Sequence, residues 1–342
     1  MKRLMLAALL LLSCLLLIGC VPHDPLADIV SASMDVTIPA PSDDQAIHDR
    51  SAATLWFRFG TEGLLAPETR MLELSPTAPY ELTLLQALVG GPAASSLELQ
   101  GLYPPGTRVV STYRQGRLLF VTLSRQIMNN WADEPDGAVP DGEWAGEIRL
   151  RRLLGMQAIA ATITENCDVD QVVVLVEQGS ELTGSMRLRE SYYRTGAPDS
   201  ALAAPLTRNE ALLLTPHTTL QLILQCWAER DWQRLYPFVA RTDPADGAAR
   251  PGYADFAAAM NALPHLTQSR FSGGSVTPDG LYAAFTLEAE LLQDGHAASL
   301  TGAVIRLYRE RGIWRIGLSQ LTDREVNTPC SAAGCLPCCS PR

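Results

Sequence analysis

Residues 82–124, LTLLQALVGGPAASSLELQGLYPPGTRVVSTYRQGRLLFVTLS, contain the strongest structural signals in the chain. An apolar helical run, predicted over residues 80–89, ends at Gly91-Pro92, because proline cannot continue a helix and biases the residue before it towards an extended backbone. A Pro-Pro-Gly corner then turns the chain into a strand. A tight turn at Gln115-Gly116 leads into the return strand. We therefore predict a helix, a corner and a two-stranded hairpin.

The order and spacing of these signals resemble the GerMN domain of bacterial sporulation and spore-germination proteins. The family pattern is a helix ending in leucines and Gly-Pro, a Pro-x-Gly-Thr corner, a hairpin with glycine at its turn, and a final Val-x-Leu-Ser. The matching residues are Leu85, Leu88, Gly91, Pro92, Pro105, Gly106, Thr107, Gly116, Val121, Leu123 and Ser124. The resemblance covers about residues 52–209. It implies the order β-(β)-α-β-β-α-β, with helices on one face of a small mixed sheet.

The segments on either side extend this unit. Residues 53–59, ATLWFRF, alternate in polarity as a strand does, and a second short strand is predicted near residues 70–74. Residues 125–146 are predicted as loop. Residues 170–177, DQVVVLVE, form an apolar run typical of a central strand that is buried on both faces. A helix is predicted over residues 147–165, where one face carries Leu153, Met156, Ala160 and Ile163.

The N-terminus has the pattern of a secretory signal. Lys2-Arg3 precedes an apolar run over residues 4–18, and Gly19-Cys20 follows. This end resembles the lipobox of bacterial lipoproteins, which implies removal of residues 1–19 and attachment of a diacylglyceryl group, with palmitate-type acyl chains, to Cys20. An uncleaved transmembrane anchor is the alternative. Either way, we expect the folded part on the extracytoplasmic face of the cell membrane.

Residues 20–51 predict a flexible tether rather than a folded element. After Cys20 the composition shifts to Pro, Asp, Ser and Ala, without a sustained apolar period. Thirty such residues could span ~100 Å when extended, at ~3.3 Å per residue. This reach is enough to let the folded domains search for a partner away from the lipid surface.

The composition argues against several classes of function. The formal net charge is −10, and it falls to −12 without Lys2 and Arg3, so we do not expect attraction to nucleic acid or anionic lipid. Lys2 is the only lysine, and a P-loop requires one at the end of its glycine loop. The sequence also lacks H-E-x-x-H, G-x-S-x-G and S-x-x-K motifs. We expect no enzyme activity, no cofactor and no metal.

A second unit is predicted over residues 215–323. Thr215-Pro216 provides a helix N-cap and a first-turn proline, and residues 220–227 have helical apolar spacing. From residue 283 the apolar period becomes two, with hairpin turns at Asp-Gly and Arg-Gly. Helices followed by an antiparallel sheet, with segments 228–236 and 312–316, resemble the cone-shaped α+β folds of nuclear transport factor two and SnoaL. The predicted fold class of the chain is therefore α+β.

Cone-shaped folds of this kind often enclose a pocket, and some members use polar residues in it for acid–base catalysis. Asp231, Tyr236 and His265 are the candidate pocket residues in this sequence. The alternative is structural: Asp231 caps a helix, and the aromatic residues near it pack. Nothing in the sequence pairs a base with an orienting partner, which general acid–base catalysis requires.

Two further features have a functional and a structural interpretation. Arg149, Arg151 and Arg152 lie near the predicted start of a helix, where the dipole favours acidic residues, so they indicate either a docking patch or a solvated face. The tail, residues 324–342, suits disulfides in an oxidising compartment, with a zinc or redox site as the alternative. Its cysteines are Cys330, Cys335, Cys338 and Cys339.

These observations favour association over chemistry. We expect a lipid-anchored scaffold or interaction module in sporulation, spore germination or envelope assembly. Its partners would be other envelope or sporulation proteins, or a second copy, and not nucleic acid. The alternative is a lipoprotein that binds a small ligand in the second unit. An enclosed cavity above ~300 Å³ with convergent polar groups would favour that alternative, and a filled apolar interior would favour the interaction module.

Overall fold

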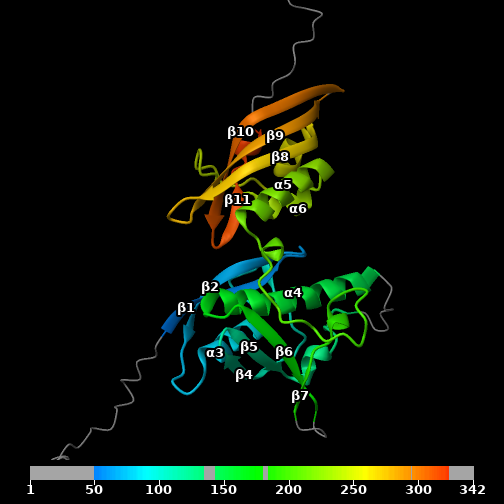
Figure 1. Ribbon diagram of the computed structural model, residues 1–342. Helices are drawn as coiled ribbons and strands as arrows, with labels where there is room; N and C mark the ends of the chain where they lie inside the picture. The colour runs from blue at the N-terminus through cyan, green and yellow to red at the C-terminus, as the bar shows by residue number, and fades with distance from the viewer. Residues whose placement is uncertain (1–49, 135–142, 180–183, 294, 323–342) are drawn as a thin grey trace, which may run out of the picture. The chain divides into compact units, whose positions relative to one another are not determined.

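The computed structural model describes residues 50–134, 143–179, 184–293 and 295–322, which belong to one compact unit (Figure 1). Cys20, most of the tether and the four tail cysteines lie outside the described residues, so the expectations for them stay predictions. No helix in the described part of the chain is long and apolar enough to cross a membrane.

The first lobe, up to residue 209, has two sheets and two long helices. Its elements are β1 (Arg50–Phe59), β2 (Leu65–Glu73), α3 (Tyr80–Val89), β3 (Leu99–Gln100), β4 (Val109–Gln115), β5 (Leu118–Leu123), α4 (Glu143–Asn166), β6 (Gln171–Glu177) and β7 (Ser185–Arg187). One sheet has the order β2-β1-β3, and the other has the order β4-β5-β6-β7. In the second sheet, β5 and β6 are parallel and the flanking pairs are antiparallel.

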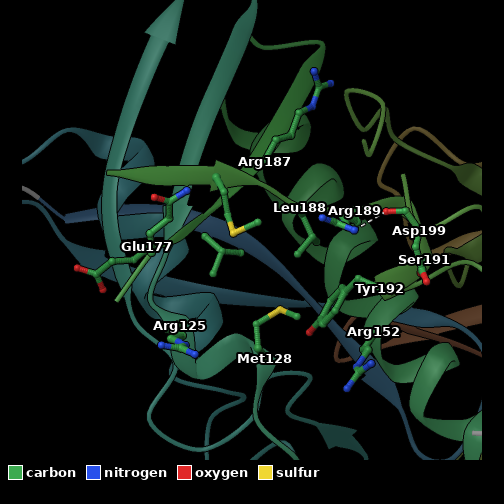
Figure 2. Close-up of a pocket in the computed structure, with 13 residues that line it drawn as sticks. Arg125, Met128, Arg152, Glu177, Arg187, Leu188, Arg189, Ser191, Tyr192 and Asp199 are labelled. Atoms are coloured by element: carbon green, nitrogen blue, oxygen red, sulfur yellow. Dashed lines mark hydrogen bonds between the residues drawn. The ribbon is translucent and has the colours of Figure 1, made fainter. Parts of the chain in front are cut away.

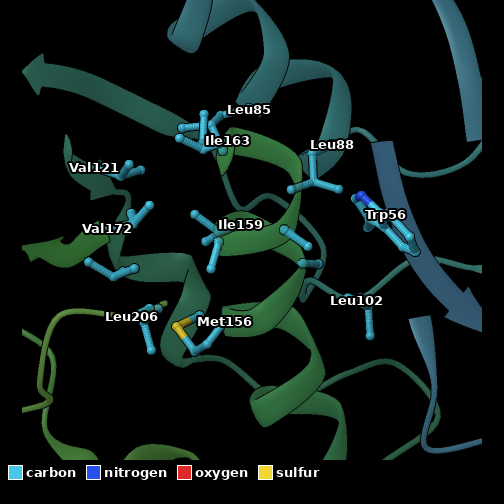
Figure 3. Packing of buried hydrophobic residues seen from close by; sticks show 14 of the residues in the cluster. Trp56, Leu85, Leu88, Leu102, Val121, Met156, Ile159, Ile163, Val172 and Leu206 are labelled. Carbon is cyan, nitrogen blue, oxygen red and sulfur yellow. The ribbon is translucent and has the colours of Figure 1, made fainter. Parts of the chain in front are cut away.

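The predicted α+β class and element order are confirmed, but the single small sheet with helices on one face is wrong. Helix α4 lies between the two sheets, and its residues 154–163 are buried around the whole circumference (Figures 1 and 3). Met156, Ile159 and Ile163 lie among residues of both sheets, such as Trp56 and Val172. A helix that is buried on all sides must be covered on more than one face, which one sheet cannot do.

Two polar side chains of α4, those of Thr162 and Asn166, form hydrogen bonds to the backbone of β1. The Asn166 side chain accepts from the Thr54 amide at 3.0 Å and donates to the Thr54 carbonyl oxygen at 2.8 Å. The Trp56 amide donates to the Thr162 hydroxyl oxygen at 3.2 Å. These bonds satisfy partly buried and buried backbone groups of β1. They also fix the rotation of α4, and with it the direction of its arginines.

Two predicted boundaries were wrong. Helix α4 begins at Glu143 rather than near residue 147, and β2 begins at Leu65 rather than near residue 70. Pro67 lies within the longer strand, and it is tolerated because β2 is an edge strand, where a missing amide need not cost a ladder bond. The earlier start of α4 places its arginines in the second and third turns, so the dipole argument against them does not hold.

The second lobe has helices followed by an antiparallel sheet, as predicted. Its elements are α5 (Pro216–Glu229), α6 (Trp232–Leu235), α7 (Tyr253–Asn261), β8 (His265–Val276), β9 (Tyr282–Gln293), β10 (His296–Glu310), β11 (Ile313–Ile316) and α8 (Ser319–Thr322). The sheet order is β11-β10-β9-β8. Thr215 and Thr218 form a capping box at the start of α5. A bulge in β8 between Gly273 and Ser275 leaves Gly274, with φ of +97°, outside the ladder.

The two lobes meet at a set of ion pairs that we call the seam, formed by Glu62, Glu98, Arg234, Glu310 and Arg315. The Arg234 guanidinium donates to both Glu62 carboxylate oxygens at 2.7 Å. Arg315 is 1% exposed and pairs with Glu98 at 2.6 Å and Glu310 at 3.2 Å. The cation at the centre of the seam is therefore neutralised by carboxylates from both lobes.

Candidate functional site

A cavity of about 520 Å³ opens on the first lobe beside α4 (Figure 2). Its wall comes from the 3₁₀ helix η2 (Arg125–Met128), the ends of β6 and β7, the third turn of α4 and the 3₁₀ helix η3 (Glu190–Tyr192). We call it the arginine pocket. It is lined by Arg125, Met128, Arg152, Val176, Glu177, Gln178, Met186, Arg187, Leu188, Arg189, Ser191, Tyr192 and Asp199.

The floor of the arginine pocket is apolar. Val176, Leu188 and Tyr192 are buried, whereas Met128 and Met186 are 47% and 44% exposed and leave the hollow open to solvent. The Tyr192 hydroxyl donates to the Ile127 carbonyl oxygen at 2.8 Å, which fixes the ring. Burial raises the pKa of Tyr192 to about 12, so this phenol stays neutral at physiological pH and does not act as a base.

Cations surround this floor. The Arg152 guanidinium carbon lies 4.7 Å from the centre of the Tyr192 ring and 5.9 Å from that of Trp131. Neither Arg152 nor Arg125 has a carboxylate oxygen within 4.0 Å among the residues that the structure describes. Arg189 donates to the Asp199 carbonyl oxygen at 2.7 Å, and Arg187 points away from Met128 (Figure 2).

The geometry favours binding of an anion with an apolar part. The Arg152 Nε atom is buried without a hydrogen-bond partner. Because that atom is buried, a ligand would meet the other guanidinium nitrogens, and a guanidinium pairs best with a carboxylate or phosphate. The Glu177 carboxylate points away from Arg152, so it does not fill this role (Figure 2). The pocket therefore offers apolar contact beside cations that have no carboxylate partner in the described structure.

The three arginines predicted as one patch lie in three different settings. Arg151 is held by Asp133 at 2.7 Å and by Glu147 at 2.8 Å. Arg149 borders a polar hollow with Arg194 and Arg208. Arg152 is the one of the three that reaches the arginine pocket. The predicted patch is therefore divided, although one of its members lies at a site suited to binding.

Sequence reasoning missed most of the arginine pocket. Arg125 and Met128 follow the hairpin in a stretch predicted as loop. Met186 belongs to a short edge strand that was not predicted, and Leu188 directly follows that strand. These residues come together only because β5 and β6 are parallel neighbours, which places their ends at one edge of the sheet. No spacing along the chain signals this.

The candidate pocket residues of the second lobe have separate surroundings. Asp231 caps α6, with its carboxylate accepting from the Arg234 amide at 3.1 Å. The Tyr236 hydroxyl donates to the Pro251 carbonyl oxygen at 2.8 Å, and Arg250 stacks on its ring. His265 is the first residue of β8, and its Nδ1 atom is buried without a hydrogen-bond partner. In the described structure no hydrogen bond or ring contact joins any two of the three.

The inner face of the second sheet is filled by side chains. The buried residues of β9 alternate along the strand, as the sequence predicted, and they pack with apolar residues of α5 to α7. The members on β9 are Ala283, Phe285, Leu287, Ala289 and Leu291. This is the filled apolar interior that favours the interaction module over a ligand-binding cone.

The two described cysteines lie in settings that keep their thiols protonated. Burial raises the pKa of Cys226 to about 12 and that of Cys167 to about 11, so both thiols stay protonated. Within the described residues, no group of three or more His, Cys, Asp or Glu side chains is arranged to hold a metal ion.

Comparison with known proteins gives distant likenesses. No family model and no curated protein matches the chain. Among solved structures, the tandem GerMN domains of the sporulation protein GerM from Bacillus subtilis align at 16% identity with a TM-score of 0.30, over 48% of this chain and 46% of that one. The chain thus spans about half the length of that structure.

Two further solved structures show similar levels of likeness. The first GerMN domain of GerM from Bacillus subtilis aligns at 15% identity with a TM-score of 0.28, over 46% of this chain and 98% of that one. A Δ5-3-ketosteroid isomerase from Mycobacterium sp. aligns at 18% identity with a TM-score of 0.23, over 30% of this chain and 91% of that one. Likenesses at this level do not assign a function.

Proposed function

We propose that this chain is a lipid-anchored protein of the extracytoplasmic membrane face that works as a protein-interaction module. Its first lobe binds a partner, and the tether lets that lobe reach it. The resemblance of residues 82–124 to the GerMN pattern favours a role in sporulation, spore germination or envelope assembly. The chain carries out no catalysis in this proposal.

The arginine pocket is the observation that carries this proposal. It combines half-exposed methionines with arginines, and both residue types are enriched at protein interfaces. Methionine side chains are flexible and polarizable, so they adapt to an irregular partner surface. The neutral Tyr192 phenol and the backbone hydrogen bond of Arg189 are the groups of a binding surface rather than of a proton-transfer site.

The anchor is tested by labelling with a radioactive or alkyne-tagged fatty acid. We expect the wild-type chain to incorporate the label and to sediment with membranes. The Cys20→Ala variant should lose both properties, with Cys226→Ala as a matched control that keeps them. Unchanged labelling of the Cys20→Ala variant would exclude the lipid anchor.

The interaction role is tested by cross-linking in living cells. A photoreactive amino acid is placed at exposed first-lobe positions Leu97, Tyr113 and Met128, and at Val304 on the second lobe as the control. We expect protein adducts from at least one first-lobe position and none from Val304. Absence of adducts from every first-lobe position, together with normal sporulation, germination and envelope integrity after gene deletion, would contradict the proposal.

A further inference from the structure

We infer that the arginine pocket recognises an acidic segment of a partner protein, in which an apolar side chain lies between or beside carboxylates. The apolar side chain would enter between Met128 and Met186, and the carboxylates would pair with Arg125 and Arg152. This inference rests on the proposed interaction role and adds the chemistry of the partner.

The first step concerns the cations. Arg152 is partly buried and held between two rings, so its guanidinium has already lost conformational freedom and part of its hydration. A carboxylate that reaches its outer nitrogens forms charge-assisted hydrogen bonds at little further cost in entropy. Arg125 is exposed and, in the described structure, free of carboxylates, so it can take a second acidic group.

The second step concerns the overall charge. The chain is acidic, with a net charge of −10, and acidic partners would be repelled over most of such a surface. Elsewhere on α4, the Arg151 guanidinium forms ion pairs with two carboxylates of the same chain, those of Asp133 and Glu147. The arginine pocket keeps two cations without such neutralisation in the described structure. Charge complementarity therefore selects a ligand that brings its own carboxylates.

The third step distinguishes a peptide segment from a small molecule. Small-molecule sites bury most of the ligand's surface. The arginine pocket is open to solvent on one side, so a small ligand there would stay partly in water. A partner protein supplies its own cover over the other side of the pocket. The flexible methionines can then close around an apolar side chain of the partner.

The test uses the full chain purified in detergent and a displayed library of random ten-residue peptides. We expect the selected peptides to carry Asp or Glu within two positions of Leu, Met or Phe. The affinity for the best selected peptide should fall about tenfold or more in the Arg125→Gln/Arg152→Gln variant, because each guanidinium makes charge-assisted bonds. Raising the salt concentration should weaken wild-type binding and change the variant much less.

The matched control is Arg270→Gln/Arg306→Gln, which removes the same charge from exposed positions of the second lobe. It should change the affinity less than twofold, and thermal melting checks that all variants fold. Selected peptides without an acidic preference, or equal losses in the two double variants, would overturn the inference. Binding of anionic vesicles or decanoate at Arg125 and Arg152 without peptide selection would also overturn it. Each of these outcomes would still be compatible with cross-linked adducts to a partner protein. The cross-linking experiment therefore tests the proposed function separately from the peptide experiment.

Discussion

Two arginine-bearing regions of this molecule show opposite uses of the same side chain. At the seam, Arg315 is almost fully buried and pairs with Glu98 and Glu310, so carboxylates of the fold neutralise its charge, although its Nε atom, like that of Arg152, makes no hydrogen bond. At the arginine pocket, Arg152 is also partly buried, yet its described neighbours are aromatic rings rather than carboxylates. The difference indicates that burial alone does not mark a structural arginine. A structural arginine is marked instead by an ion pair with a carboxylate of the same chain.

The largest effect is expected at the seam. Replacing Arg315 with Met removes the buried cation between Glu98 and Glu310 and leaves Glu98 only the more distant Arg241, and breaking a buried pair costs about 3 kcal/mol or more. Urea unfolding should show this loss in the free energy of unfolding. The exposed control, Arg306→Met, should change it by less than about 0.5 kcal/mol. A loss below about 1 kcal/mol for Arg315→Met would show that the seam does not stabilise the fold.

The next effect concerns Glu147, which pairs with the buried Arg58 and with Arg151. Burial alone would raise its pKa, but hydrogen bonds from these arginines outweigh burial and hold the pKa below its ordinary value of 4.5. The carboxylate therefore stabilises the fold above pH 4.5, and this contribution is lost as the pH falls through the lower folded-state pKa.

Glu147→Gln should accordingly cost about 2 kcal/mol at neutral pH, since it leaves Arg58 without its carboxylate. The difference between wild type and variant should shrink as the pH is lowered below 4.5. Unfolding curves in urea at several pH values measure this difference in the free energy of unfolding. A difference that stays constant through acid pH would show that the Glu147 pKa is not lowered by folding.

A smaller effect is expected from Tyr192→Phe. The change removes the hydroxyl that donates to the Ile127 carbonyl oxygen, which should cost about 1 kcal/mol of folding free energy. The ring remains under Arg152, so peptide affinity should change less than threefold. Thermal melting and peptide titration measure the two quantities. A large loss of affinity would show that the hydroxyl, rather than the ring, orients the pocket.

The smallest effect on stability is expected at the pocket itself. Arg152→Gln removes a guanidinium that has no carboxylate partner in the described structure, so the free energy of unfolding should change by no more than about 1 kcal/mol, the range of its contacts with the Tyr192 and Trp131 rings. Chemical unfolding measures this directly. A loss above about 2 kcal/mol would place Arg152 with the structural arginines of the seam.

Local chemistry made much of the fold predictable. The helix at residues 80–89 and the hairpin after it follow from side chains that act within a few residues. Gly106 and Gly116 supply φ values of +81° and +62°, which other residues rarely adopt. The alternation in β9 was equally clear, because one face of that strand packs on the core and the other does not.

Long-range pairing made the rest unpredictable. The division of the first lobe into two sheets depends on which strands pair, and the sequence of β1 does not identify β2 and β3 as its only partners. The arginine pocket depends on the same pairing, because it joins η2 to the ends of β6 and β7. Arg151 and Arg152 are adjacent in sequence, and only the fold shows that Arg151 is neutralised while Arg152 has no carboxylate partner among the described residues.

The most direct test of the central claim compares these adjacent arginines. The affinity for the best selected acidic peptide is measured for the wild type, Arg151→Gln and Arg152→Gln by isothermal titration calorimetry. We predict that the affinity falls about fivefold or more for Arg152→Gln and less than twofold for Arg151→Gln. The Arg151 guanidinium of the wild type is already paired with Asp133 and Glu147. Equal losses, or a larger loss for Arg151→Gln, would contradict the assignment of the arginine pocket as the binding site.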